Sequence, residues 1–175
     1  MAEQQKFTVE IPENLDQETR AAIGVEIVDF IIKRSQGGKD KNNVNFPAYS
    51  KSYVDSFDFD LAGKDEKPNL TLTGEMLNAL TVLENEQGKI TIGIPSSDDF
   101  NNAKAEGNIK GTYGRSTPDP AKARDFMGIA TKDLDSIVNK FSKGPDADAN
   151  VFATLRAAAA STELANSFLR IEGEV

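Results

Sequence analysis

Two pairs of acidic residues are the clearest candidates for chemistry in this 175-residue chain. Asp98 and Asp99 are adjacent, and Asp58 and Asp60 are two residues apart, so either pair could ligate a cation or act as acid and base. The chain has no His and no Cys, which excludes Ser-His-Asp and Cys-His triads, His or thiolate metal sites and disulfides. Nothing in the sequence organises either acidic pair, so we predict no enzymatic activity, no catalytic or metal site and no cofactor.

A glycine-rich segment, Gly107-Asn-Ile-Lys-Gly-Thr-Tyr-Gly-Arg115, is the nearest approach to a phosphate-binding loop. It lacks the Gly-Lys-Ser/Thr ending of such loops, and no helix follows at once, so residues 107–120 are predicted to be a plain loop. Tyr113 and Arg115 are its large side chains. Arg115 and Arg124 could bind an anion, but arginine beside aromatic residues is also typical of protein interfaces.

The charge balance further limits the classes of function. The chain carries 20 Lys and Arg against 28 Asp and Glu, a formal net charge of −8, which disfavours gripping nucleic acid through its phosphates. No apolar run reaches the roughly 18 residues of a membrane span, and the first residues do not resemble a signal peptide, so we expect synthesis in the cytoplasm and no membrane association. Hydrophobic residues make up only 38% of the chain, which favours a surface completed by partners.

The hydrophobic pattern predicts an α+β fold. Residues 6–12 and 89–95 alternate apolar and polar side chains, as half-buried strands of one sheet do. Helices are predicted at 14–35, 73–83 and 131–143, with a shorter one from a capping sequence at 96–99 to about residue 106. Phe57, Phe59 and Leu61 alternate with Asp58 and Asp60, which predicts an edge strand with a wet, charged face. The predicted sheet is small, mixed or antiparallel, and packed by about three helices.

The last part of the chain has a different pattern. A narrow, Ala-rich stripe that includes Leu155 runs along residues 148–170, with Phe152 and Phe168 beside it. We therefore predict a domain at 1–144 and a C-terminal helical arm at 145–175. The stripe could pack on its own domain or on a neighbouring subunit, and the sequence leaves both open.

Five sequence blocks follow one another between residues 46 and 141. An aromatic segment comes first, then a helix start with a Thr-Gly pair, a strand, an Ala-containing short helix with a Gly turn, and a Pro-x-x-x-Arg-x-Phe-Met-Gly-Ile block before the closing helix. They are Phe46-Pro-Ala-Tyr-Ser-Lys51, Leu70-Thr-Leu-Thr-Gly-Glu-Met-Leu-Asn-Ala-Leu80, Ile90-Thr-Ile-Gly-Ile94, residues 103–114 and Pro120-Ala-Lys-Ala-Arg-Asp-Phe-Met-Gly-Ile129.

In their order and spacing these blocks resemble the phage virion morphogenesis family, the tail-completion or neck (head–tail connector) proteins of tailed phages. Three features depart from the family pattern, and one of them is that the Arg-rich stretch before the Pro block is reduced to Arg115. Asn101-Asn-Ala-Lys-Ala105 stands where the family has an aromatic-Ala-x-x-His sequence, and residues after Gly144 have no counterpart in the family.

The resemblance implies a structural virion protein, located in the neck or tail after synthesis in the host cytoplasm. Such proteins form rings, here expected to be sixfold or twelvefold, that join the tail terminator or tail tube to the portal or head-closure proteins. DNA would pass through the ring as cargo, and an acidic lumen would let it slide. Three alternatives remain open: another virion part (head-closure, adaptor or tail-terminator protein), a carboxylate-dependent hydrolase, and a non-enzymatic cytoplasmic binding module.

Aromatic and arginine side chains are the expected subunit contacts. Phe46, Tyr49 and Tyr53 lie in the aromatic block, and Pro118 and Pro120 are expected to stiffen the segment that carries Arg124 and Phe126. The full predicted contact set is Phe46, Tyr49, Tyr53, Tyr113, Arg115, Arg124, Phe126, Phe152, Leu155 and Phe168.

Overall fold

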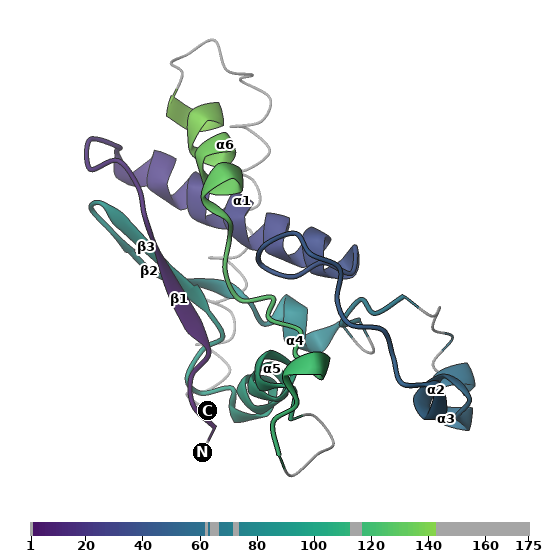
Figure 1. The fold of residues 1–175 in the computed structure, drawn as a ribbon. Helices are drawn as coiled ribbons and strands as arrows, with labels where there is room; N and C mark the ends of the chain where they lie inside the picture. The colour runs from purple at the N-terminus through teal and green to yellow at the C-terminus, as the bar shows by residue number, and fades with distance from the viewer. Residues whose placement is uncertain (1, 62, 64–66, 72–73, 113–116, 143–175) are drawn as a thin grey trace.

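The computed structural model describes residues 2–61, 63, 67–71, 74–112 and 117–142, and within these residues the fold is α+β. A three-stranded antiparallel sheet is accompanied by six α-helices and one 3-10 turn, η1 (Figure 1). In chain order they are β1 (Lys6–Glu10), α1 (Gln17–Gln36), α2 (Lys51–Val54), α3 (Phe57–Leu61), α4 (Glu75–Asn78), β2 (Thr81–Glu86), β3 (Lys89–Gly93), α5 (Asp99–Lys110), η1 (Pro120–Lys122) and α6 (Thr131–Ser142). None of the described helices is long and apolar enough to cross a membrane.

The two strands predicted from alternation do share one sheet. β3 lies in the centre, with β1 and β2 antiparallel on either side, so that Phe7 faces Ile92 and Val9 faces Ile90 across the first pair. Ile90, Ile92 and Ile94 have no exposed surface. The alternation of apolar residues thus identified the central strand of the sheet, where burial is greatest.

Helix α1 covers the sheet, and α6 packs on α1 (Figure 1). Helix α1 begins at Gln17, after the predicted start at residue 14, because the Asp16 carboxylate caps it by accepting a hydrogen bond from the backbone N–H of Thr19 (2.7 Å). Ile23, Ile27 and Ile31 form its fully buried stripe. Gly24 lets the helix approach β2 closely, since an added Cβ would lie 2.8 Å from a methyl group of Val82.

The predicted helix at 73–83 is wrong in its second half. Only Glu75–Asn78 is helical, and the chain then enters β2 from Thr81. Met76, Leu77 and Leu80 are buried at helical spacing, which is why the pattern favoured one long helix. β2 pairs instead with β3, and its β-branched residues Thr81 and Val82 suit an extended backbone.

The predicted edge strand at 57–61 is also wrong, because this segment is the helix α3. Ser56 precedes it, and the Ser56 hydroxyl oxygen accepts a hydrogen bond from the backbone N–H of Phe59 (3.3 Å). Such a side-chain cap favours a helical turn over an extended chain. The helix α5 likewise runs beyond its predicted end, so residues 107–110 are helical and the loop begins at Gly111, whose positive φ of 68° ends the helix.

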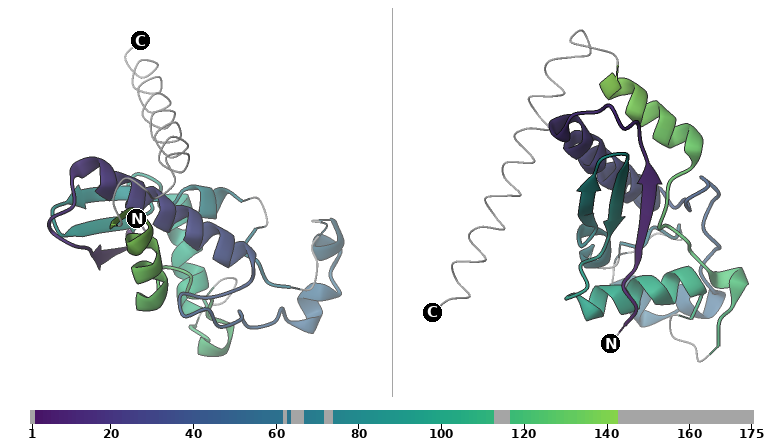
Figure 2. Two further views of the ribbon diagram at one scale, coloured as in Figure 1. Left: turned by 90° about the horizontal axis from the view of Figure 1, so that it is seen from above. Right: turned by 90° about the vertical axis from the view of Figure 1, so that its left-hand side faces the viewer.

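Helices α2 and α3 pack on each other and stand away from the sheet and its covering helices (Figures 1 and 2). We call residues 49–61 the α2–α3 arm. The left-hand view of Figure 2 shows the arm at one extreme of the molecule, connected to the body by extended chain. The molecule therefore consists of a packed body and one projecting helical element.

Candidate subunit-contact surface

Three aromatic rings form the interior of the α2–α3 arm. The rings of Tyr49, Tyr53 and Phe59 meet edge to face, with centroid separations of 5.2 Å (Tyr49–Tyr53), 5.8 Å (Tyr49–Phe59) and 5.4 Å (Tyr53–Phe59). Such geometry stabilises aromatic pairs beyond the area they bury. Phe59 is almost entirely buried within this group. The arm thus has a small core of its own.

Arg124 connects the arm to the body. Its guanidinium lies 5.0 Å from the centre of the Tyr49 ring, a cation–π contact, and its backbone N–H donates to the Asn108 carbonyl of α5 (2.7 Å). Burial lowers the pKa of the guanidinium from its ordinary value, and the neighbouring Tyr49 and Tyr53 oppose that change. Arginine titrates so far above neutral pH that Arg124 remains a cation there. It therefore fixes the base of the arm against α5.

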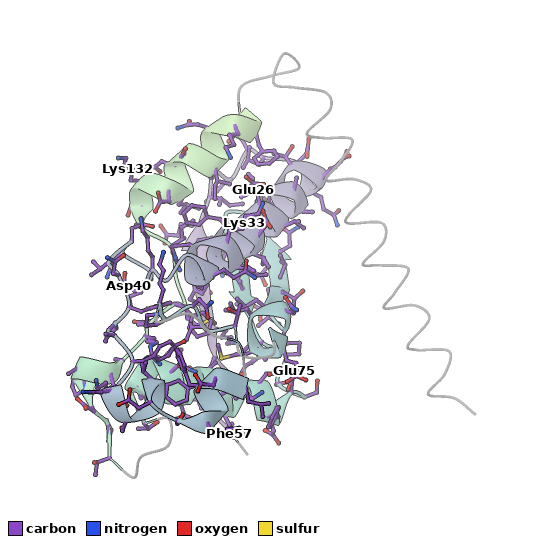
Figure 3. All side chains as sticks on the ribbon, turned by 90° about the vertical axis from the view of Figure 1, so that its right-hand side faces the viewer. Glu26, Lys33, Asp40, Phe57, Glu75 and Lys132 are labelled. Carbon is purple, nitrogen blue, oxygen red and sulfur yellow. The ribbon has the colours of Figure 1, made fainter. Side chains whose placement is uncertain are left out.

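The outer face of the arm is apolar. Phe57 and Leu61, one turn apart in α3, are 75% and 74% exposed, the two highest values among the large hydrophobic residues that the structure describes. Phe57 is labelled on the arm in Figure 3. Asp55 and Asp60 lie beside this face and are exposed, and neither makes a salt bridge with another described residue. The arm therefore presents a hydrophobic pair within an acidic surround.

A second surface feature lies at the C-terminal end of α1, where a depression of about 430 Å³ is lined in part by Phe30, Lys33 and Asn43. Two carboxylates in its wall are already paired. Asp29 accepts from Lys33 (2.5 Å), and Glu26 accepts from Lys140 of α6 (2.9 Å). Figure 3 shows Glu26 and Lys33 on α1, well apart from Phe57 of the arm.

Two further cations, Arg34 and Lys39, line this depression, and the charges of Asp133, Asp40 and Asp125 act on Arg34 by opposing the effect of burial on its pKa. The Arg34 guanidinium donates to the backbone carbonyls of Phe126 (2.7 Å) and Lys41 (3.4 Å), and burial lowers its pKa. Lys39 is exposed and forms no salt bridge with a described residue. With Val44, 60% exposed and next to Asn43, the depression combines apolar surface with unpaired positive charge.

The structure places the predicted contact residues in three different settings. Phe126 is fully buried and Phe46 is 6% exposed, and both belong to the core of the body. Almost no part of either ring lies on the surface of the single chain, and their role as subunit contacts stays a prediction. Tyr49, Tyr53 and Arg124 come together at the arm, partly buried, so they support its shape rather than form its outer face. Tyr113, Arg115, Phe152, Leu155 and Phe168 lie outside the described residues, as does the predicted extension at 145–175.

The stiff, extended segment expected around Pro118 and Pro120 is in part a turn. Residues 120–122 form η1, and the Asp119 carboxylate accepts a hydrogen bond from the backbone N–H of Ala121 (3.0 Å), which caps that turn. The segment is therefore folded against the body, and a role in docking along a neighbour has no support from its geometry.

The acidic pairs have structural explanations where they are described. Asp98 caps α5, and hydrogen bonds from the side chain and the backbone N–H of Asn101 (2.8 and 3.0 Å) lower the pKa of its carboxyl. Asp60 lies on a helix rather than on a strand face. Among the described residues, no three acidic side chains gather closely enough to hold a metal ion.

Sequence reasoning missed the exposed pair Phe57 and Leu61 as contact residues. The available signal was their spacing of four, which places two large apolar side chains on one helix face once the segment is recognised as helical. It also missed the depression at the end of α1, because residues from α1 and from the following loop form it together. Comparison of the chain with models of protein families, with curated proteins and with solved structures finds no match.

Proposed function

We propose that this chain is a structural component of a phage particle, one that assembles into a ring in the neck and joins the tail to the head or portal complex. The observation that supports this most directly is the α2–α3 arm, a projecting element whose outer face carries Phe57 and Leu61. An apolar pair on a projection is suited to contact with another protein molecule. The order of sequence blocks between residues 46 and 141 resembles that of phage neck proteins, and this resemblance is the reason for proposing a ring as the type of assembly.

The arm alone cannot hold such an assembly together. Burying Phe57 and Leu61 together yields about 3–6 kcal/mol, at about 1.5–3 kcal/mol each, which offsets only the lower part of the roughly 4–15 kcal/mol that association of two proteins costs in lost freedom of motion. A ring contact must therefore include further surface, and neighbours such as a tail terminator, tail tube, portal or head-closure protein would add to it. A protein that assembles fully only on its template fits this balance.

The charge of the chain is consistent with a passage for DNA. A formal net charge of −8 gives a surface that repels phosphates on average, so DNA in the ring would slide rather than bind. This part of the proposal requires that acidic side chains, rather than Lys and Arg, line the lumen of the ring. A lumen dominated by basic side chains in an image of the assembly would refute it.

The test is the location of the chain in particles. Virions purified from an infected culture are analysed by mass spectrometry for this chain and imaged by electron microscopy, with antibody labelling to locate it. We expect the chain in stoichiometric amounts at the head–tail junction, in rings of sixfold or twelvefold symmetry. Its absence from purified particles would refute the proposal, and its presence elsewhere in the particle would refute the neck assignment. Heads and tails that fail to join when the gene is disrupted would support it.

A further inference from the structure

We propose that the α2–α3 arm of one copy docks into the depression at the C-terminal end of α1 in the next copy, with Phe57 and Leu61 as the inserted side chains. The inference rests on the proposed function, because it identifies the contact by which copies would follow one another around a ring. The occupant is thus a second copy of this chain.

The arm has the chemistry of an inserting element. Segment 51–61 carries one Lys and three Asp, a formal charge of −2, and its outer face is made by Phe57 and Leu61. The edge-to-face packing of Tyr49, Tyr53 and Phe59 already fixes the inner face. Because the inner face is ordered by its own contacts, docking of the outer face requires little additional ordering of the arm.

The depression has the complementary chemistry. Phe30 supplies an apolar wall, and Val44, which follows the lining residue Asn43 in sequence, is exposed. The carboxylates of Glu26 and Asp29 are held by Lys140 and Lys33. Lys39 therefore remains as an exposed cation without a salt bridge to another described residue, and Asp55 and Asp60 of an incoming arm offer carboxylates to it.

The two surfaces belong to different parts of the chain, so the contact between copies is head to tail. Under a two-fold rotation the two copies would exchange arms and close as a dimer, whereas under any other rotation a contact of this type leaves one free arm and one free depression in each pair of copies. It generates a ring when the rotation between copies closes, and an open filament when it does not. The geometry therefore gives the ring of the proposed function a specific interface.

Cross-linking tests the contact, because a chain without Cys allows single thiols to be introduced at will. Full-length protein that carries Leu61→Cys is mixed with full-length protein that carries Val44→Cys, and the mixture is treated with a short bismaleimide. The protein concentration is about 0.5 mM, at which even a contact with a Kd near 1 mM is partly populated. Ser97→Cys, at an exposed turn away from both surfaces, replaces Val44→Cys in the control mixture.

We expect a mixed dimer of Leu61→Cys with Val44→Cys in several-fold higher yield than with Ser97→Cys. Equal yields in the two mixtures would overturn the inference. Preferential cross-linking of Leu61→Cys with itself would also overturn it, because it would show that arms pair with arms.

Charge reversal supplies a second, independent measurement. Asp60→Lys and Lys39→Glu, introduced separately with the cysteines, are each expected to lower the cross-linking yield, and the two together are expected to restore it with the charges exchanged. Lys132→Glu, on the exposed face of α6, is the matched control for a lost positive charge. Equal effects of Lys39→Glu and Lys132→Glu would overturn the role given to Lys39, and with it the inference.

These results separate the inference from the proposed function. Rings seen at the head–tail junction together with no arm–depression cross-link would overturn the inference alone. A strong cross-link in a chain that is absent from virions would refute the neck function and leave the contact between copies in place.

Discussion

Replacing Asn102 with Ala should destabilise the chain strongly, although this residue had no role in the sequence analysis. Asn102 lies in α5 and is 1% exposed. Its side-chain amide donates to the backbone carbonyls of Pro95 (2.8 Å) and Asp98 (2.9 Å), and its side-chain oxygen accepts from the backbone N–H of Gln5 (2.8 Å). One side chain thus joins the N-terminal segment, the end of the central strand and the start of α5.

The loss of stability in Asn102→Ala comes from the backbone groups that would lose their hydrogen-bond partner. A buried donor or acceptor that loses its partner costs about 1–3 kcal/mol. The Asp98 carbonyl keeps a hydrogen bond from the backbone N–H of Asn102 (3.0 Å), and the N–H of Gln5 is only partly buried, so the three losses do not count in full. The better helix propensity of Ala returns about 0.6 kcal/mol. We expect Asn102→Ala to lower the free energy of unfolding by about 2–4 kcal/mol, and to lower Tm by about 5–12 °C.

Urea and thermal unfolding followed by circular dichroism measure this loss. Asn139→Ala is the matched control, since it makes the same substitution at an exposed position inside α6, where the side chain forms no hydrogen bond with another described residue. That variant should be as stable as the parent or slightly more so. If Asn102→Ala and Asn139→Ala were equally stable, the three hydrogen bonds would contribute nothing, and the argument from burial would be refuted.

Asn102→Asp sharpens the test through pH. The carboxylate would face the carbonyl oxygens of Pro95 and Asp98, so its pKa in the folded chain should rise above that in the unfolded chain. A raised folded pKa means that stability is greatest below the unfolded pKa and falls as pH increases through the folded one. Relative to the parent at the same pH, Asn102→Asp should therefore lose less stability near about pH 4 than near about pH 7. A loss independent of pH would contradict the placement of the side chain.

Three further outcomes follow from the structure. Phe126→Ala should lower the free energy of unfolding by about 3–5 kcal/mol, because it empties a fully buried site. Phe57→Ala, at an exposed site, should leave the free energy of unfolding nearly unchanged and reduce self-association. Equal unfolding curves for the two variants would contradict the assignment of Phe126 to the core and Phe57 to the surface. Gly93→Ala should destabilise the β1–β3 pair, since its Cβ would lie 2.5 Å from the Gln5 carbonyl oxygen, and an unchanged urea midpoint would rule out that close approach. The pKa of the Asp98 carboxyl is lowered in the folded chain, so its contribution to stability is present above the pKa of the unfolded chain and is lost as pH falls through the pKa of the folded chain. Asp98→Asn should remove that part of the acid dependence of unfolding. Identical profiles of stability against pH for the parent and the variant would argue against the cap.

Much of the body of the fold could be predicted from the sequence, because its elements have long and consistent patterns. The apolar stripe of α1 covers several turns and begins after a capping Asp16, and α6 carries a shorter stripe in which Ile137 and Phe141 are buried. Ile90, Ile92 and Ile94 alternate strictly in the strand that became the sheet's centre. In each case local preference and tertiary burial favour the same structure.

The errors lie where a short pattern fits two structures. Leu77 and Leu80 fit a helix that continues to residue 83, and only the pairing of β2 with β3 in the folded sheet determines that a strand starts at Thr81. Five residues at 57–61 alternate as a strand would, yet no sheet edge lies beside the arm for them to join. Periodicity over so few residues does not distinguish the two structures.

The contact set shows a different limit. Aromatic residues are enriched both in cores and at interfaces, so residue type alone could not assign Phe46 or Phe126 to one or the other. Their burial depends on α1, whose Arg34 donates to the Phe126 carbonyl across 92 positions of sequence. A contact of that sequence separation becomes visible only in the folded chain.

The arm has the strongest implication for function because two phenylalanines in the same helix differ sharply in burial. Phe59 is buried among tyrosines, and Phe57, two residues earlier in the same helix, is 75% exposed. A single exposed hydrophobic residue needs no explanation, but Leu61 extends the apolar face by a full turn. If the arm served only to cover its own chain, polar residues at 57 and 61 would keep its inner packing intact and avoid the risk of aggregation. The outer pair therefore has a use that the single chain does not satisfy, and another protein surface with an apolar wall and an exposed cation is the kind of partner that would satisfy it.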